Sequence, residues 1–374
     1  MNIALFVTAF LGVFALITVY TGRRLINHLH LSETLKRYLR LFLVLNFAGI
    51  IGYMLARYFT ATPNWLYFLL SLPIGVLFLL FCTAVIYDIF RVGMTYIPMQ
   101  PQRRSFFKKG LDVGALTLAF GVSAKATHEA RIVELEKVTV RIRNLARPYS
   151  IVQLSDIHIG GLIGERFMRD IVNRVNRLNP DLVVITGDLV DVKPSQVSGA
   201  LKALKGLKSV YGTCFVAGNH EYFHGIEEII MHVKSLGIRV LGNENLYIGE
   251  EGRGFHLAGV HDVFGYRVKH HQPDIYSALK GIGKDSPTVL LAHQPRFVEE
   301  ADGKVDLMLS GHTHGGQLFP FKVLVKLQQP YISGLHRHSE RTQVYVNKGT
   351  GFWGPPMRLG ASSEITYIKL EGTA

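Results

Sequence analysis

The chain has 374 residues, of which 48% are hydrophobic, and a formal net charge of +13 at pH 7. Its mean hydropathy of +0.21 is high for a purely soluble protein. The first 129 residues or so hold 12 Lys and Arg against 4 Asp and Glu, and the remainder holds 29 against 24. A nucleic-acid-binding protein would carry a dense basic face on its folded domain, so this distribution argues against a nucleic-acid partner.

Three apolar runs near the amino terminus are long enough to cross a membrane, which takes roughly 20 residues. They cover about residues 3–20, 39–59 and 65–86, within an expected membrane region of residues 1–127. The loop 21–40 and the loop after the third run are rich in Lys and Arg, whereas residues 60–64 carry no charge. Because positive loops stay in the cytoplasm, the sequence predicts a multi-pass protein of the bacterial cytoplasmic (inner) membrane.

A motif at residues 103–108 resembles the twin-arginine export signal, with Arg103 and Arg104 followed by apolar residues and Lys108. A fourth apolar segment at about 110–126 ends in a small-x-small triplet that resembles a cleavage site. If the signal operates, the twin-arginine export machinery is a partner and the following domain lies on the extracytoplasmic side. Such signals normally open a protein, and this one is internal. The alternative is a basic loop followed by an amphipathic helix on the membrane surface.

From residue 131 to residue 374, strands alternate with amphipathic helices. Buried strands are predicted at 151–154, 182–186, 213–217, 289–292 and 307–309, and further strands at 131–142, 238–241, 255–260, 342–346 and 364–370. Helices are predicted at 165–178, 195–206 and 226–236. This alternation predicts an α/β domain with a largely buried mixed sheet flanked by helices.

Polar residues follow the ends of five buried strands. They are Asp156, His158, Asp188, Asn219, His220, His293, His312 and His314. Because ligands collect at the carboxyl ends of strands in open α/β sheets, these side chains are expected to converge. Imidazoles and oxygens without a thiolate suit Mn, Fe or Zn. Gly187, Gly218 and Gly311 permit sharp turns and close backbone approach beside them.

The order and spacing of these blocks resemble the calcineurin-like metallophosphoesterase family. The matching stretches are 156–158, 187–191, 218–221, His293 and 311–314, within a domain at 131–374. The resemblance implies two packed mixed β-sheets flanked by helices, a four-layer αββα sandwich. Among its branches the chain is most similar to bacterial membrane-associated or twin-arginine-exported phosphoesterases, some relatives of which cleave the pyrophosphate of lipid-linked UDP sugars.

The resemblance also implies two divalent metal ions and a role for each matching residue. The first ion would be held by Asp156, His158, Asp188 and His314, and the second by Asp188, Asn219, His293 and His312. Paired ions can activate a bridging water for in-line attack on phosphorus. His220 is implied as the catalytic residue that binds substrate and protonates the departing oxygen. Asp191 and Glu221 would orient the ligands from behind.

The expected function is a membrane-anchored, metal-dependent phosphohydrolase acting on phosphomonoesters, diesters or pyrophosphates, with a lipid-linked substrate as one option. His261 is a candidate substrate-binding residue because the loop 261–273 follows a strand. Arg358 is another, because residues 351–358 place an aromatic pair beside a cation; a buried turn is the alternative. Two other functions remain as alternatives. A noncatalytic metal-binding scaffold should have lost some of the ligand residues, and none is missing. A transporter should carry acidic residues inside its membrane spans, where Asp88 is the one acidic residue and lies at an end.

Overall fold

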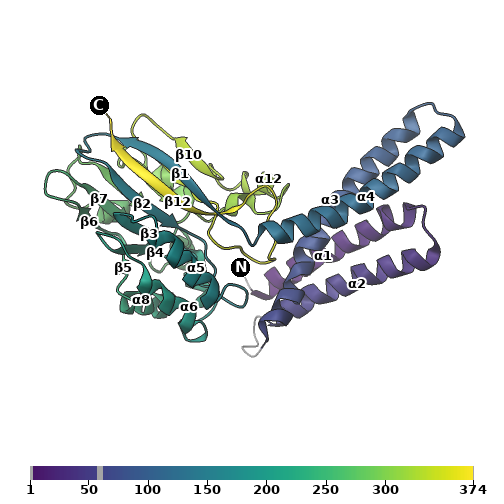
Figure 1. Ribbon diagram of the computed structural model, residues 1–374, viewed down its shortest axis with the longest axis horizontal. Helices are drawn as coiled ribbons and strands as arrows, with labels where there is room; N and C mark the ends of the chain where they lie inside the picture. Colours follow the sequence, from purple (N-terminus) through teal and green to yellow (C-terminus); the bar gives the residue numbers. More distant parts are fainter. Residues whose placement is uncertain (1–2, 57–61, 374) are drawn as a thin grey trace. The chain divides into compact units, whose positions relative to one another are not determined.

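The computed structural model describes residues 3–56 and 62–373 (Figure 1). The chain divides into two compact units. One unit comprises Met1–Glu129 and Gly354–Leu359, and the other comprises Ala130–Trp353 and Gly360–Ala374. The short segment Gly354–Leu359 therefore belongs with the amino-terminal helices rather than with the residues around it in sequence.

The described part of the first unit contains four α-helices and the short 3-10 helix Ile26–His28. The α-helices are α1 (Ile3–Arg24), α2 (Glu33–Ala56), α3 (Asn64–Tyr96) and α4 (Pro101–Glu129). Three stretches of the described residues are long and apolar enough to cross a membrane: Val7–His28, Glu33–Ala56 and Asn64–Tyr96. They include most of the three predicted spans, although residues 57–59 of the second span lie outside the described residues.

Helix α3 continues through Pro73, as expected for an apolar helix whose neighbours compensate for the missing N–H group. A Cβ atom on Gly49 of α2 would lie 2.8 Å from Cγ of Pro73, so the glycine lets the two helices pack closely at this point. Asp88, near the end of α3, pairs with Arg24 at 2.6 Å and with Arg91 at 2.7 Å. This carboxylate therefore balances two cations.

Helix α4 contains both the arginine motif at 103–108 and the fourth apolar segment at 110–126 in one continuous helix. It is not among the three membrane-span candidates found in the described part of the chain. Its helical form is compatible with an export signal and with a surface helix. The twin-arginine interpretation therefore stays a prediction.

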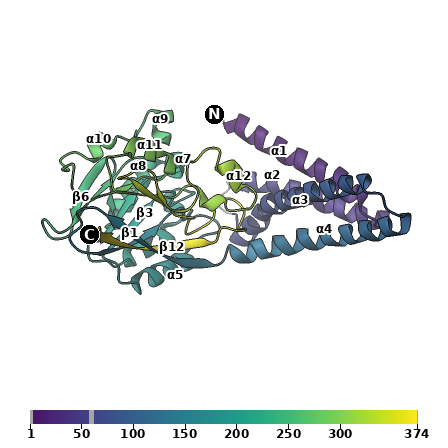
Figure 2. The same cartoon turned by 90° about the horizontal axis from the view of Figure 1, so that it is seen from above.

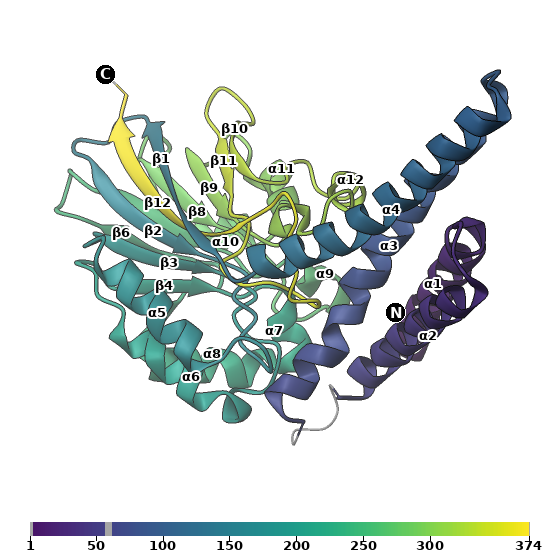
Figure 3. The ribbon, with the colours of Figure 1, turned by 45° about the vertical axis from the view of Figure 1, so that its right-hand side comes forward.

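The second unit contains two six-stranded sheets, which Figure 3 shows from the side. The first sheet has the order β1 (Val133–Ile142), β12 (Ser363–Gly372), β2 (Tyr149–Leu154), β3 (Leu182–Thr186), β4 (Thr213–Val216) and β5 (Arg239–Val240). The second has the order β10 (Gly334–Arg337), β11 (Gln343–Val346), β9 (Leu307–Ser310), β8 (Thr288–Leu291), β7 (Phe255–Gly259) and β6 (Glu244–Ile248). Strands β2, β3 and β4 are parallel, and so are β7, β8 and β9, while both sheets also contain antiparallel pairs.

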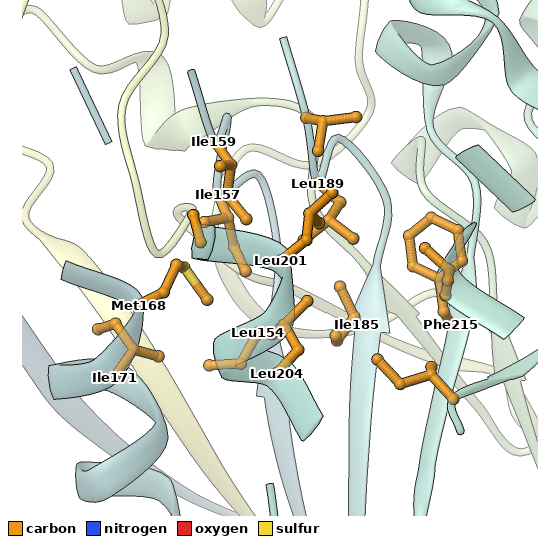
Figure 4. Packing of buried hydrophobic residues seen from close by; sticks show 14 of the residues in the cluster. Leu154, Ile157, Ile159, Met168, Ile171, Ile185, Leu189, Leu201, Leu204 and Phe215 are labelled. Carbon is orange, nitrogen blue, oxygen red and sulfur yellow. The ribbon is translucent and has the colours of Figure 1, made fainter. Parts of the chain in front are cut away.

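Three apolar cores separate four layers. The first core lies between the first sheet and helices α5 (Glu165–Asn176), α6 (Ser198–Ala203) and α8 (Ile226–Ser235), and Figure 4 shows part of it. The second joins the inner faces of the two sheets, for example Val184 of β3 and Leu291 of β8. The third packs the second sheet against α10 (Ile275–Ala278) and α11 (Val298–Ala301). Figure 2 places α10 and α11 on one side of the strands and α5 on the other.

This arrangement confirms the predicted four-layer αββα sandwich. The alternation of side chains along each inner strand explains it, because successive residues point to opposite faces and both faces are covered. Strands β6 and β10, at the edges of the second sheet, were not predicted, nor was the short helix α12 (Lys322–Val325). The buried parallel strands β2, β3, β4, β8 and β9 are the ones that carry the predicted polar residues at their carboxyl ends.

Candidate metal centre

The structure brings the predicted ligands together at the carboxyl ends of five strands. Asp156 and His158 follow β2, Asp188 follows β3, and Asn219 and His220 open the short helix α7 (Asn219–His224) after β4. The second sheet supplies His293 after β8 and the pair His312 and His314 after β9. Residues from two different sheets therefore meet at one place. Two groups among them could each hold a metal ion.

The first group consists of Asp156, His158 and His314. The Nε2 atoms of His158 and His314 lie 3.0 Å apart, and Nε2 of His314 lies 3.5 Å from Oδ1 of Asp156. Oδ2 of Asp188 lies 3.9 Å from Nε2 of His158. All four side chains are buried or nearly so.

The second group consists of Asp188, His293 and His312. Nε2 of His293 lies 3.2 Å from Oδ2 of Asp188, 3.2 Å from Oδ1 of Asn219 and 3.3 Å from Nδ1 of His312. The same oxygen of Asp188 thus faces an imidazole of each group. This is the position that a carboxylate shared by two ions must occupy.

The hydrogen bonds of His293 show that a cation fits here. Its Nδ1 lies 2.7 Å from the carbonyl oxygen of Thr186, which can only accept, so this nitrogen carries a proton and donates it. In the neutral ring, Nε2 is then a lone pair that faces the oxygens of Asp188 and Asn219. Acceptors that face one another in a buried site need a proton or a metal ion between them. The imidazole and oxygen donors, with no thiolate among them, fit Mn, Fe or Zn.

Asp191 contacts one imidazole from the ligand group and one from the predicted catalytic residue. Its Oδ1 accepts from Nδ1 of His158 at 2.7 Å and from Nδ1 of His220 at 2.6 Å. Both rings are thereby held with Nε2 directed toward Asp188, each at 3.9 Å from its Oδ2. A carboxylate behind a ligating histidine fixes its tautomer and orientation.

Glu221 holds the backbone of the turn that carries Asp188. Its buried carboxylate accepts from the N–H groups of Asp188 at 3.0 Å, Leu189 at 2.9 Å and Gly218 at 2.6 Å. It therefore connects the turn after β3 with the turn after β4. Its side chain does not belong to either group of metal-binding atoms.

The predicted glycines are required where they stand. Gly187 has φ +87°, a conformation that L side chains rarely adopt. A Cβ on Gly218 would lie 2.3 Å from Oδ1 of Asp188, and one on Gly311 would lie 1.9 Å from Oγ of Ser155 and 2.1 Å from Oδ2 of Asp156. These positions leave no space for any side chain.

Five of the predicted ligands have left-handed backbone conformations. They are Asp156, His158, Asp188, His312 and His314, with φ between 49° and 71°. Each such conformation costs on the order of 1–3 kcal/mol and persists only where the surroundings enforce it. The costs fall on residues of the site, which is where strained backbone is typically found.

The charges of the site favour a cation. Burial opposes ionisation of Asp188, but His293 and His220 hold the pKa of its carboxyl well below its usual range. Burial likewise disfavours the charged ring of His293, yet Asp188 and Asp156 raise its pKa well above the usual value. Burial also disfavours the charged ring of His220, but Asp188 and Asp191 outweigh this effect and raise its pKa to about 9. The buried carboxylates therefore attract positive charge, as protons or as metal ions.

The two predicted substrate-binding residues lie outside these groups. His261 follows β7 and contacts His271, with 3.4 Å between the ring nitrogens; Glu227, His270 and His271 form a separate group that could hold an ion. Arg358 is fully buried in the segment that belongs with the helical unit, and its N–H donates to the carbonyl of Ala126 at 2.8 Å. Of the two interpretations of residues 351–358, the burial of Arg358 agrees with the buried turn and not with an exposed cation. The substrate roles of both residues stay predictions.

Two supporting contacts had no signal in the sequence. Ser155 donates to Oδ2 of Asp156 at 2.6 Å, and the backbone carbonyl of Thr186 orients His293. A serine before a ligand is common for many reasons, and a carbonyl group is present in every residue. Only the three-dimensional arrangement reveals either contact.

The two packed sheets and the clustered His and Asp residues agree with a metallophosphoesterase domain. The chain belongs to the calcineurin-like metallophosphoesterase family, and the model of the calcineurin-like phosphoesterase family matches residues 149–316. A metallophosphoesterase of Helicobacter pylori (strain J99) is 38% identical over 366 residues, which are 97% of this chain and 97% of the relative.

Two further relatives extend the comparison. One from Campylobacter jejuni is 34% identical and covers 96% of each chain. A protein of Danio rerio named transmembrane protein with metallophosphoesterase domain is 34% identical over 90% of this chain and 81% of its own length. The apolar helices and this relative's name indicate that the chain is associated with a membrane.

Proposed function

We propose that this chain is a dinuclear metal-dependent phosphoesterase anchored in a membrane, which hydrolyses phosphomonoester, diester or pyrophosphate bonds. The observation that carries the proposal is the position of Asp188. Its Oδ2 faces His293 at 3.2 Å and His158 at 3.9 Å, one imidazole from each candidate group. An oxygen ligand between two sets of nitrogen ligands is what two neighbouring cations require.

The residues that would hold the ions follow from the two groups. Asp156, His158 and His314 would bind one ion; His293, His312 and Asn219 the other; Asp188 would contact both. When bound, such ions would activate water and neutralise the phosphoryl oxygens. The side chains of Asp156 and Asp188 are buried, so water does not compete with a metal ion for their oxygens.

His220 is proposed to serve the departing oxygen. Its Nδ1 is tied to Asp191, so its Nε2 is the nitrogen that points into the site. A nitrogen so directed can bind a phosphoryl oxygen and pass a proton to the leaving group. The rings of Phe223 and Trp353, with centroids 5.5 Å and 5.9 Å from that of His220, limit how far the imidazole can turn.

The activity is tested by hydrolysis of a bis-aryl phosphate by the full chain in detergent with Mn²⁺. We expect turnover that falls at least a hundredfold in Asp188→Asn and His220→Ala, because the first removes the shared charge and the second the proton donor. His232→Ala, on α8, is the matched histidine control and should retain activity. No turnover at full metal occupancy would favour the noncatalytic scaffold.

Export of the domain is proposed on the arginine motif alone. Arg103, Arg104 and Lys108 match the twin-arginine pattern, which would place the phosphoesterase domain outside the cytoplasmic membrane. Replacing both arginines by lysine should then leave the domain inside. Protease treatment of spheroplasts measures this, and a wild-type domain that resists external protease would defeat the proposal.

A further inference from the structure

The segment 315–331 begins and ends beside Thr313, the residue between two of the predicted metal ligands. Thr313 lies between His312 and His314, and its Oγ donates to the carbonyl of Ile332 at 2.5 Å and accepts from the N–H of Gly315 at 3.3 Å. Both ends of the segment are thereby fixed to the metal-binding turn. Anything that binds the segment is held beside the site.

This segment exposes several large apolar side chains. Helix α12 (Lys322–Val325), within the segment, has no buried residue. The exposed side chains are Phe319, Phe321, Val323, Leu324 and Leu327, the last with 79% of its surface exposed. Large apolar side chains gathered and exposed in one short segment are typical of an interaction site. We call these five residues the apolar face.

The base of the segment is firmly held, so the exposure does not come from a loose loop. Gln329 is buried, its Oε1 accepts from the N–H of Arg296 at 3.0 Å, and its Nε2 donates to Gln294 at 3.2 Å. At the other end, a Cβ on Gly316 would lie 2.2 Å from Cβ of Lys322, which shows how closely the chain folds on itself there. The apolar face is presented by a packed structure.

The charge of the segment is entirely positive. Residues 315–339 contain no Asp or Glu, whereas Lys322 and Lys326 are exposed within the apolar face. Nζ of Lys322 lies 5.6 Å from the ring centroid of Phe319. Aromatic and aliphatic side chains with lysines among them are typical of surfaces that enter the boundary between lipid headgroups and acyl chains. The lysines favour anionic headgroups.

The apolar face continues toward the proposed catalytic residue. Gln317 accepts from the N–H of Trp353 at 3.0 Å and donates to its carbonyl at 2.8 Å, which fixes this half-exposed tryptophan. The Trp353 ring contacts His220, and Phe223, which is 55% exposed, contacts His220 from α7. A surface bound to the segment would therefore reach the edge of the site.

We propose that the apolar face inserts into the surface of an anionic bilayer, and that the site acts on a phosphoester group held in that bilayer. A bilayer is favoured over a protein partner because the same chain carries three helices apolar enough to span one, and because the lysines match anionic lipid. The second half of the proposal rests on the proposed phosphoesterase function, and the first half does not.

Insertion can be measured in the full chain reconstituted in lipid nanodiscs that contain anionic phosphatidylglycerol. In a Cys82→Ser background, Leu327→Cys labelled with bimane is compared with Val210→Cys. Val210 is also highly exposed, at 71%, but precedes β4 and lies at the opposite edge of the sheet from the site. The buried thiol of Cys214 should not take the label.

We expect doxyl groups carried by the lipid to quench the label at 327 and aqueous iodide to reach it poorly, with the reverse at 210. Exchange of Lys322 and Lys326 for Gln should lower the ratio of inserted to free segment about fivefold for each lysine. Equal iodide access at both positions would overturn the proposal. So would a label at 327 that is shielded from iodide but not quenched by lipid, because protein would then cover the face.

The substrate half is tested with the variant that carries both Phe319→Ser and Leu327→Ser. Hydrolysis of an aryl phosphate ester of diacylglycerol in the same discs should fall at least fivefold, while hydrolysis of soluble bis-aryl phosphate stays within twofold. Equal loss on both substrates, or on neither, would overturn this half. If the wild type hydrolyses neither, the phosphoesterase function fails, and the quenching result still decides insertion.

Discussion

Replacement of Asp191 by Asn tests whether this carboxylate orients both the metal ligand His158 and the proposed catalytic residue His220. The carboxylate accepts from Nδ1 of His158 at 2.7 Å and from Nδ1 of His220 at 2.6 Å. Burial opposes its ionisation, but these two histidines hold the pKa of Asp191 well below its usual range. The lowered pKa favours the charged carboxylate, which accepts both hydrogen bonds. Asn keeps the shape and removes the charge.

The size of the effect follows from the two hydrogen bonds. A hydrogen bond to a charged group contributes about 1.5–3 kcal/mol and a neutral one about 0.5–1.5 kcal/mol, so each bond loses roughly 1 kcal/mol. The loss at His158 should appear as weaker metal binding, about fivefold, and the loss at His220 as a kcat about fivefold lower. When metal is limiting, the two effects multiply and the activity should fall roughly 30-fold. Asp191 is thus a positioning residue.

A double-mutant cycle with His220→Ala separates the two effects. With saturating Mn²⁺, Asp191→Asn should lower kcat about fivefold in the wild type and less than twofold in the His220→Ala background, because the histidine through which it acts is gone. Metal titration should show the same weakening in both backgrounds. A kcat effect of equal size in both backgrounds would refute this assignment of Asp191.

Three further results are expected. Gly311→Ala should lose metal binding and about 1–3 kcal/mol of stability, because its Cβ would lie 1.9 Å from Oγ of Ser155. The control Gly164→Ala, where a Cβ meets no atom within 4 Å, should change neither metal binding nor stability. A Gly311→Ala chain that still binds metal would contradict the packing argument. Chelation should lower the unfolding temperature of the domain by roughly 10 °C if metal is present at about 1,000 times its Kd, which calorimetry measures; no shift would mean that no ion stabilises the fold. Burial raises the pKa of the Cys214 thiol to about 12, so a Cys82→Ser chain should react with a thiol reagent at pH 8 only after unfolding. Rapid labelling of the folded chain would show that β4, which carries Cys214, is not buried.

The parts of the fold that the sequence predicted well are those where one physical requirement dominates. Strand β3 is buried along its whole length, so Leu182–Thr186 is uniformly apolar until a glycine and Asp188 end it. The same pattern at β8 and β9 identified His293, His312 and His314. Edge strands follow no such rule. Strand β6 is exposed or half-exposed over most of its length, and its sequence Glu244–Ile248 alternates too weakly to predict a strand.

Contacts between side chains could not be predicted from spacing. The sequence placed Asp191 near the ligands, but only the structure shows that it joins His158 to His220. Gln153 is another case, because its amide donates to Thr186 of the same sheet and to the carbonyl of Ser310 of the other, both at 2.9 Å. For Arg358 the sequence left an exposed cation and a buried turn both open, and the side chain is fully buried; no local pattern distinguishes a buried arginine from an exposed one.

Anomalous diffraction from crystals of the full chain grown with Mn²⁺ would examine the centre most directly. We predict two peaks about 3.5–4 Å apart with Asp188 touching both, one bordered by His158 and His314 and the other by His293 and His312. A single peak, or two peaks of which Asp188 touches only one, would contradict the account.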